Sequence, residues 1–167
     1  YLIISDRIKA SAKDTISFLR EKQSCEIAML TGDRNSAAAT VAAELGIKKV
    51  YGELLPEGKW EQLEKFMQDP IYLRKGKRGT TLFVGDGMND APVLARADVG
   101  ITIGVNASGA AVESADVVIL SSDLTGLNKS ILIAKKTVRI VSENIALALI
   151  VKGIILVLAS LGITHLW

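Results

Sequence analysis

The residues best suited to chemistry stand together in one string of nine, Val84-Gly85-Asp86-Gly87-Met88-Asn89-Asp90-Ala91-Pro92. The two glycines around Asp86 let the backbone turn sharply after an apolar run, which exposes the Asp86 carboxylate. Asp90 follows four residues later, at the start of an expected helix, and can face the same cleft. Two carboxylates and the Asn89 amide form a hard-oxygen set suited to Mg²⁺ beside a phosphate. The structural alternative is a glycine turn with an aspartate helix cap, and the full string favours function.

Two further motifs can hold phosphate. Thr31-Gly32-Asp33 follows the apolar run CEIAML, where a hydroxyl and exposed backbone N–H groups can bind phosphate oxygens. The segment Leu55-Pro56-Glu57-Gly58-Lys59 places Lys59 in the first turn of an expected helix, where its ammonium can neutralise phosphate charge. Taken singly, the first motif is a common turn and the second an ordinary solvated lysine.

Short apolar runs alternate with helical patterns up to about residue 124, and this alternation must position the motifs. The expected strands are 1–5, 27–30, 50–51, 80–84, 99–103 and 117–120, and the expected helices are 13–22, 36–45, 56–67, 90–97 and 107–114. The helix 36–45 should end in a cap at Gly46, and 75–79 should be a basic turn. Such alternation predicts βαβ units and an α/β fold with a parallel sheet. Both Gly-Asp pairs fall at the carboxyl ends of strands, where such sheets place functional groups.

Composition excludes several classes of protein. Apolar residues make up 49% of the 167 residues and charged residues 23%, which excludes a disordered chain. The net charge of +2 gives no case for nucleic acid as a partner. One cysteine, Cys25, precludes an intrachain disulfide, and we expect it to be a buried strand residue.

The composition changes after Leu124. An amphipathic, basic helix is expected over 127–143, followed by 22 residues, 145–166, whose one strong charge is Lys152. At 1.5 Å per residue this run spans roughly 33 Å, enough to cross a hydrocarbon core of about 30 Å. The basic residues precede the run, which places its amino-terminal side in the cytoplasm. The alternative is a buried core helix of a soluble protein.

In their order, the three motifs resemble those of the haloacid-dehalogenase superfamily, and the string 85–92 resembles the version found in P-type ATPases. The resemblance implies a Rossmann-like, three-layer parallel sheet that accepts phosphate from ATP on an aspartate, with Mg²⁺. It implies that Thr31 and Lys59 contact the aspartyl phosphate and that Asp86 binds Mg²⁺. Asn89 and Asp90 would complete the catalytic and cofactor site, with Gly32 and Asp33 beside it.

The family's phosphorylated aspartate lies in an Asp-Lys-Thr-Gly-Thr string, which this sequence lacks. Asp6 follows an apolar run, but Ile8 stands where a phosphatase of the superfamily has its second aspartate. Residues 6–9 instead resemble the hinge that follows the nucleotide-binding domain, with Lys9 where the family usually has arginine. We therefore expect the nucleophile and the nucleotide-binding domain upstream of residue 1. The chain alone would be half an active site and inactive.

The apolar run indicates which class of metal ion the protein would transport. Residues 144–153 resemble the membrane helix of zinc, cadmium and lead exporters, which has a lysine at this place, and lack the Tyr-Asn pair of copper pumps. The resemblance implies that Lys152 is a counter-ion of the transport site, paired with an aspartate on the next helix; the alternative is a lysine that snorkels to the interface.

The expected whole is an ATP-driven exporter of a divalent metal, placed in a bacterial plasma membrane. Its parts would be a cytoplasmic phosphorylation domain over 1–125, a stalk helix over 126–143 and a transmembrane helix over 144–167. Its partners would be the rest of the pump, the lipid bilayer and the transported metal. One alternative is a soluble phosphatase of the superfamily, which has no use for the apolar run. The other is a non-catalytic, membrane-anchored regulatory fragment, which the missing nucleophile keeps open.

Overall fold

The computed structural model describes residues 8–69, 73–74 and 77–162, in two compact units that are described separately. The first unit is Tyr1–Asn128 and the second is Lys129–Trp167. The strand expected over 1–5 lies outside the described residues, as does Asp6. The expected boundaries at 125/126 and 143/144 stay predictions.

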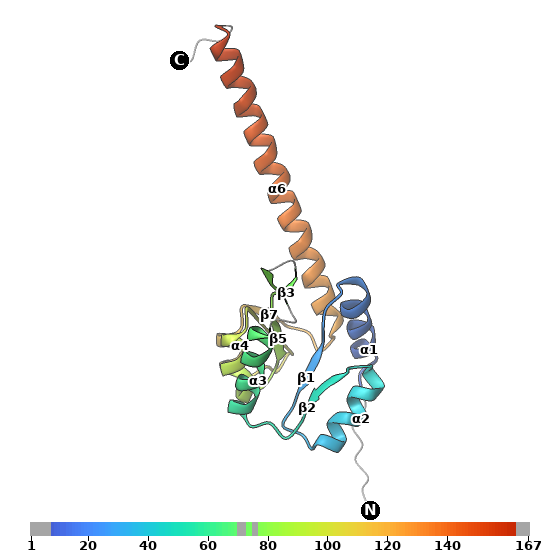
Figure 1. Ribbon diagram of the computed structural model, residues 1–167. Helices are drawn as coiled ribbons and strands as arrows, with labels where there is room; N and C mark the ends of the chain where they lie inside the picture. The colour runs from blue at the N-terminus through green and yellow to red at the C-terminus, as the bar shows by residue number, and fades with distance from the viewer. Residues whose placement is uncertain (1–7, 70–72, 75–76, 163–167) are drawn as a thin grey trace, which may run out of the picture. The chain divides into compact units, whose positions relative to one another are not determined.

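Short strands and helices alternate through the first unit, as the sequence predicts (Figure 1). In chain order the elements are α1 (Ala10–Ser17, continued by the π-helical turn Phe18–Lys22), β1 (Ala28–Leu30), α2 (Asn35–Leu45), β2 (Lys49–Tyr51), α3 (Pro56–Gln68), β3 (Leu73–Arg74), β4 (Lys77–Arg78), β5 (Leu82–Gly85), the 3₁₀ turn η3 (Met88–Asp90), α4 (Ala91–Arg96), β6 (Val99–Ile103), α5 (Gly109–Ser114) and β7 (Val117–Ile119).

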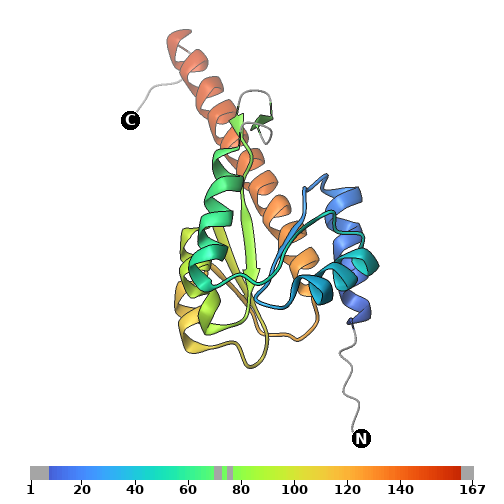
Figure 2. The ribbon, with the colours of Figure 1, turned by 60° about the horizontal axis from the view of Figure 1, so that its bottom comes forward.

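The strands form two parallel sheets and one small hairpin. Strand β1 pairs in parallel with β2, and β5, β6 and β7 form a parallel sheet in that order. Figure 2 shows α1 and α2 beside the first sheet and α3 and α4 on the second. The predicted α/β class with parallel sheets is confirmed. The hairpin of β3 and β4 was not expected, because residues 77–78 were assigned to a turn.

Local sequence signals explain where the helices begin and end. Gly46 ends α2 in the left-handed conformation, with φ of 69°, which confirms the predicted glycine cap. Pro56 begins α3, where its fixed φ suits the first helical turn and its missing N–H is not needed. Ser108 caps α5 by accepting a hydrogen bond from the Ala111 N–H. These signals set the ends of the helices that flank the candidate site.

A small apolar core holds α3 and α4 together. Leu63 and Met67 of α3 pack with Val93 of α4, and Phe83 of β5 and Ala97 adjoin this cluster. Leu63 follows Lys59 by one helical turn, so the packing of α3 also fixes the base from which the Lys59 side chain extends.

One expectation about the first unit is wrong. Cys25 is exposed and precedes β1, whereas the sequence pattern predicted a buried strand residue. The strand begins only at Ala28, after Ser24 takes a positive φ of 54° and turns the chain. The apolar run CEIAML is therefore longer than the strand that it contains.

Helix α6 is continuous from Thr125 to Ser160 and supplies the described part of the second unit. Within the described residues it is the one helix long and apolar enough to cross a membrane. Its large apolar side chains are exposed, among them Leu147 (62%), Leu149 (65%) and Ile150 (59%). Exposure along 145–157 does not fit the buried core helix of a soluble protein.

Gly100→Ala should destabilise the first unit by about 1–3 kcal/mol, the usual penalty of overpacking. A Cβ at Gly100 of β6 would collide with the backbone carbonyl of Leu94, which α4 presses against the strand. The measurement is urea denaturation of the chain in detergent micelles, followed by tryptophan fluorescence.

Gly109→Ala is the matched control for this prediction. A Cβ at Gly109 would meet no atom within 4 Å, so the unfolding midpoint should stay or rise slightly. Equal midpoints for the Gly100→Ala variant and the wild type would show that α4 does not need this close approach.

Candidate active site

The end of β5 is built so that Asp90 folds back over the strand. A Cβ at Gly85 would lie 2.9 Å from both Cβ and Oδ2 of Asp90, so a glycine is required there. The 3₁₀ turn η3 then brings Asp90 to the start of α4, with its N–H donating to the Gly87 carbonyl at 3.1 Å. The predicted glycine turn is therefore present, and it places the Asp90 carboxylate beside the strand end.

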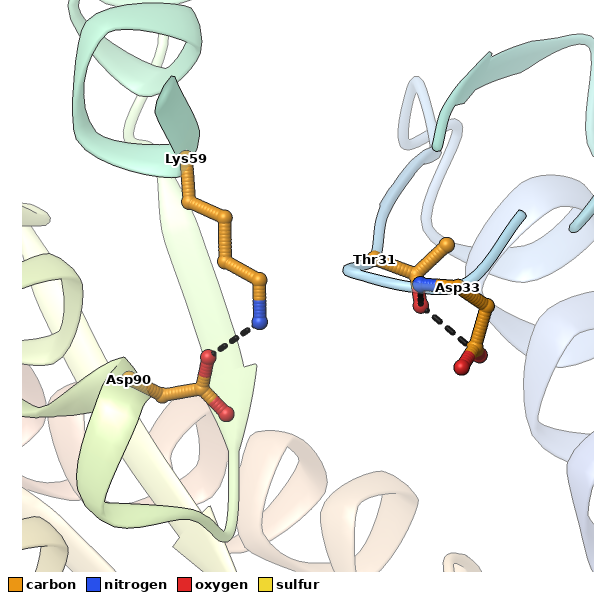
Figure 3. Close-up of polar contacts among 4 residues, drawn as sticks. All are labelled: Thr31, Asp33, Lys59 and Asp90. Carbon is orange, nitrogen blue, oxygen red and sulfur yellow. Dashed lines mark hydrogen bonds and ion pairs between the residues drawn. The ribbon is translucent and has the colours of Figure 1, made fainter. Parts of the chain in front are cut away.

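Lys59 and Asp90 form an ion pair, although 31 residues separate them in the chain. The Nζ of Lys59 lies 2.7 Å from Oδ1 of Asp90, and the two side chains are only 15% and 14% exposed. Figure 3 shows the lysine extending from the first turn of α3 to the aspartate. Two motifs that the sequence analysis singled out separately thus meet in space.

Thr31 and Asp33 form a second polar pair after β1 (Figure 3). The Thr31 hydroxyl donates to Oδ2 of Asp33 at 2.9 Å, and the Asp33 N–H donates to the same hydroxyl oxygen at 3.1 Å. Gly32, between them, is exposed. The Thr31-Gly32-Asp33 motif is thus a turn closed by two hydrogen bonds, and the Thr31 hydroxyl proton points at the Asp33 carboxylate.

Asp86 and Asn89 are both exposed beyond the end of β5. Asp86 lines a cavity of about 470 Å³ at the carboxyl ends of β5 and β6, together with Lys9, Asn106 and Ser122. The Lys9 ammonium donates to the Ser122 carbonyl across this cavity at 3.2 Å. The sequence had placed Lys9 in a hinge, by resemblance only, and did not predict that Ser122 lies at this site.

The predicted site residues therefore fall into two groups. Lys59, Asp86, Asn89 and Asp90 gather around the end of β5, whereas Thr31, Gly32 and Asp33 follow β1 in the other parallel sheet. Within the parts of the chain that the structure describes, these two sheets share no strand pairing.

The donors present fit Mg²⁺ better than a metal that needs a complete protein cage. In the described residues, no group of three or more His, Cys, Asp and Glu side chains gathers in metal-binding geometry. Mg²⁺ usually takes one or two carboxylates, phosphate oxygens and waters. Asp86 is an exposed carboxylate of this kind, with the Asn89 amide three residues on.

A family model described as haloacid dehalogenase-like hydrolase matches residues 1–98, more than half of the chain. The chain belongs to the haloacid dehalogenase-like hydrolases. The predicted superfamily is thereby confirmed.

Two curated relatives narrow the branch of this superfamily. The chain is 43% identical over 166 residues to the cadmium, zinc and cobalt-transporting ATPase of Bacillus subtilis (strain 168), covering 99% of the chain and 23% of that protein. It is also 43% identical over 142 residues to copper-transporting ATPase 2 of Rhizobium meliloti (strain 1021), covering 85% of the chain and 16% of that protein.

The crystal structure of a zinc-transporting PIB-type ATPase in its E2.Pi state matches 98% of the chain with a TM-score of 0.85 and 36% identity. This chain covers 25% of that protein, so it spans about a quarter of its length and of the length of the Bacillus ATPase, and less of the Rhizobium ATPase. The chain is homologous to heavy-metal-transporting P-type ATPases, which are ATP hydrolases.

Asp90→Asn should lower the free energy of unfolding by about 1.5–3 kcal/mol, the range for hydrogen bonds to charged groups. The substitution leaves the largely buried Lys59 ammonium without a counter-charge. Urea denaturation in detergent measures the change.

Glu44→Gln provides a control with the same carboxylate-to-amide change. Glu44 pairs with Lys13 at 2.8 Å, but both side chains are 52% exposed, so the loss should stay below about 0.5 kcal/mol. Similar losses in the two variants would show that burial adds nothing to the Lys59–Asp90 pair.

Proposed function

We propose that this chain is part of a P-type ATPase that exports a divalent heavy metal, and that its first unit supplies most of the site where an aspartyl phosphate forms and breaks down. The observation that carries the proposal is the Lys59–Asp90 ion pair beside the exposed Asp86 carboxylate. Phosphoryl transfer needs little covalent chemistry from the protein and depends on positioning and electrostatic stabilisation. A lysine fixed at a carboxylate-rich strand end is suited to both tasks.

The charge of the site supports a role for Mg²⁺. Three carboxylates, those of Asp33, Asp86 and Asp90, lie near the carboxyl ends of β1 and β5, and Asp90 binds the Lys59 ammonium. Even with Lys9 included, the negative groups outnumber the positive ones. A phosphoryl group would be repelled from this edge without a cation, and Asp86 with Asn89 would hold Mg²⁺, which neutralises charge on phosphate oxygens when bound.

The open sheet edges support a nucleophile supplied by another part of the pump. Each of β1 and β5 has one strand partner among the described residues, β2 and β6 respectively. Leu82 and Val84 of β5 remain 40% and 38% exposed, although strands of parallel sheets are usually buried on both faces. We assign the edge that is unpaired among the described residues to the strand with the Asp-Lys-Thr-Gly-Thr string, which would stand next to Thr31, Lys59 and Asp86.

The described side chains then have distinct tasks. Lys59 would bind a phosphoryl oxygen while Asp90 holds its ammonium in place. Thr31 would donate a hydrogen bond to a second phosphoryl oxygen. A hydroxyl has one proton to donate, so the Thr31 hydroxyl would have to give up its hydrogen bond to Asp33. Asp90 is thus a positioning residue for Lys59, and Asp86 is the better candidate for Mg²⁺.

The class of metal depends on α6 rather than on the first unit. A relative named for cadmium, zinc and cobalt and one named for copper match this chain with equal identity, so identity alone does not select the cargo. Lys152 lies in α6 within the apolar run, seven residues after Ile145, and a charge inside a membrane is a functional candidate. We assign it as a counter-ion of the transport site in a zinc, cadmium or lead exporter, with the first unit on the cytoplasmic side.

The two alternative functions have less support. A soluble phosphatase would not need the exposed apolar side chains of α6, and the match to the Bacillus ATPase covers 99% of the chain. A non-catalytic fragment would not need a buried lysine–aspartate pair beside an exposed carboxylate at a strand end. An upstream Asp-Lys-Thr-Gly-Thr string in the same reading frame would exclude both alternatives.

Asp86→Asn in the full-length pump should lower metal-stimulated ATP hydrolysis about 100-fold or more, the usual effect of losing one group that stabilises the transition state. The exposed side chain has no packing role, so the unfolding temperature should not change. Phosphate release and phosphoenzyme labelling with ATP measure the effect.

Asp14→Asn, the same change at an exposed position of α1, should leave hydrolysis at the wild-type rate. Normal turnover with normal Mg²⁺ dependence in the Asp86 variant would reduce Asp86 to a turn residue.

Lys152→Ala in the full-length pump should lower zinc-stimulated hydrolysis by at least about fivefold, the lower end of typical coupling between two sites. Without the tethered ammonium, the bound metal loses a competitor for its carboxylate ligand, and release slows. Lys152→Arg should be poorly tolerated, because guanidinium is larger and planar. Hydrolysis assays with zinc, cadmium and lead make the measurement.

Lys136→Ala, which removes a lysine of the same helix before the apolar run, should have little effect on metal stimulation. Wild-type stimulation of the Lys152→Ala variant by all three metals would assign the lysine to the membrane interface and remove the support for a zinc-type exporter.

A further inference from the structure

We propose that Asn35 and Glu53 are positioning residues that clamp the Thr31 turn to the start of α3, and so set where Thr31 lies relative to Lys59. The inference rests on the proposed function, because it assigns the clamp to the phosphate site. Neither residue belongs to the motifs that the sequence analysis selected.

The clamp consists of side-chain hydrogen bonds between Asn35, the first residue of α2, and the loop after β2. The Asn35 amide donates to Oε2 of Glu53 at 2.7 Å, and Oδ1 of Asn35 accepts from the Gly52 N–H at 3.2 Å. The Asn35 side chain thus uses both its nitrogen and its oxygen, with partners 18 and 17 residues away in the chain. An asparagine on a solvated helix end has no need for such a pairing.

Backbone hydrogen bonds continue the same junction toward Thr31. The Glu53 N–H donates to the Asp33 carbonyl at 2.7 Å, and the Leu54 N–H donates to the Thr31 carbonyl at 3.0 Å. Leu54 also approaches Gly58 in the first turn of α3, at 3.4 Å from the position of a Cβ there. The Thr31 turn is therefore joined to the turn of helix that presents Lys59.

The junction is tight enough to hold one residue in a strained conformation. Glu53 has a positive φ of 56°, which is uncommon for any residue but glycine. A Cβ at Gly52 would lie 2.7 Å from Oδ1 of Asn35 and 2.9 Å from the Asp33 carbonyl. Such conformations persist where the surrounding contacts over-determine them, and they cluster at functional sites.

The clamp joins two ligands of one phosphoryl group. Thr31 comes from the loop after β1 and Lys59 from the first turn of α3, so the distance between them depends on the contacts that join these two segments. A phosphoryl group bound by both requires their separation to be held within a fraction of an ångström, because small displacements weaken positioned hydrogen bonds. The hydrogen bonds of Asn35 and Glu53 go to each other and to neighbouring backbone, so the two residues would act through Thr31 and Lys59.

The test is labelling of the full-length pump by inorganic phosphate with Mg²⁺ and without ATP, over a range of phosphate concentrations. Asn35→Ala should raise the phosphate concentration at half-maximal labelling about three- to tenfold, the effect of one or two lost hydrogen bonds. Arg34→Ala, an exposed neighbour in the same loop, should leave it unchanged.

A reciprocal exchange separates positioning from general damage. Asn35→Asp alone sets two carboxylates against each other and should weaken phosphate labelling more than Asn35→Ala does. Combined with Glu53→Gln, the amide and carboxylate change places, the Gly52 N–H keeps its acceptor, and the phosphate dependence should return to within about twofold of wild type. No recovery in the double variant would overturn the clamp.

Glu53→Gly tests the inference in a variant that folds at least as well as wild type. Glycine relieves the positive φ, so the unfolding temperature should stay or rise, while the lost carboxylate should still weaken phosphate labelling several-fold. Unchanged phosphate dependence in both Glu53→Gly and Asn35→Ala would exclude a positioning role.

Thr31→Ala distinguishes failure of the clamp from failure of the proposed function. If Thr31→Ala weakens phosphate labelling and the clamp variants do not, the inference alone is wrong. If Thr31→Ala also leaves labelling unchanged, Thr31 is no phosphate ligand, and the role of the clamp is excluded with it.

Discussion

The structure of the candidate site depends on the ion pair between Lys59 and Asp90. Lys59 belongs to the helix that follows β2, and Asp90 to the turn that follows β5, so the pair links parts of the chain whose sheets share no described strand pairing. An ammonium that is 15% exposed needs a partner, because desolvation otherwise disfavours its charge. Asp90 provides that partner only because Gly85 has no side chain to exclude it. The absence of a Cβ at Gly85 therefore allows Lys59 of α3 to pair with Asp90 at the end of β5.

The polar groups proposed to bind phosphate are both occupied by carboxylates in this structure. The Thr31 hydroxyl donates to Asp33, and the Lys59 ammonium binds Asp90. An incoming phosphoryl group would thus replace Asp33 as the acceptor of the single Thr31 hydroxyl proton, whereas at Lys59 it would join Asp90, because an ammonium has three protons to donate. The strained loop at Glu53 and the largely buried ion pair keep the two donors in place during such an exchange.

The sequence predicted the elements of the first unit well, because they follow from local signals. Helix α2 has its glycine cap, α3 its proline, and β6 a largely apolar run. The sequence did not predict the β3–β4 hairpin, whose residues alternate in no periodic pattern, or the exposure of Cys25, which depends on a turn at Ser24. Among site residues, motif spacing selected Lys59 and Asp90 but not their contact. Asn35 and Glu53 were missed because a hydrogen bond across 18 residues leaves no trace in composition or spacing.

The segment just before α6 lines the same cavity as Asp86. Asp123 caps the helix, accepting from the Thr125 N–H at 3.0 Å, and its neighbours Ser122 and Leu124 line the same cavity as Asp86. Lys9 crosses this cavity to the Ser122 carbonyl. A cation bound by Asp86 would therefore add charge next to both an ammonium and the capped end of a helix, and it would favour displacement of Lys9. The segment that leads into α6 and the proposed Mg²⁺ ligand therefore face the same cavity, and a cation there would act on this segment electrostatically.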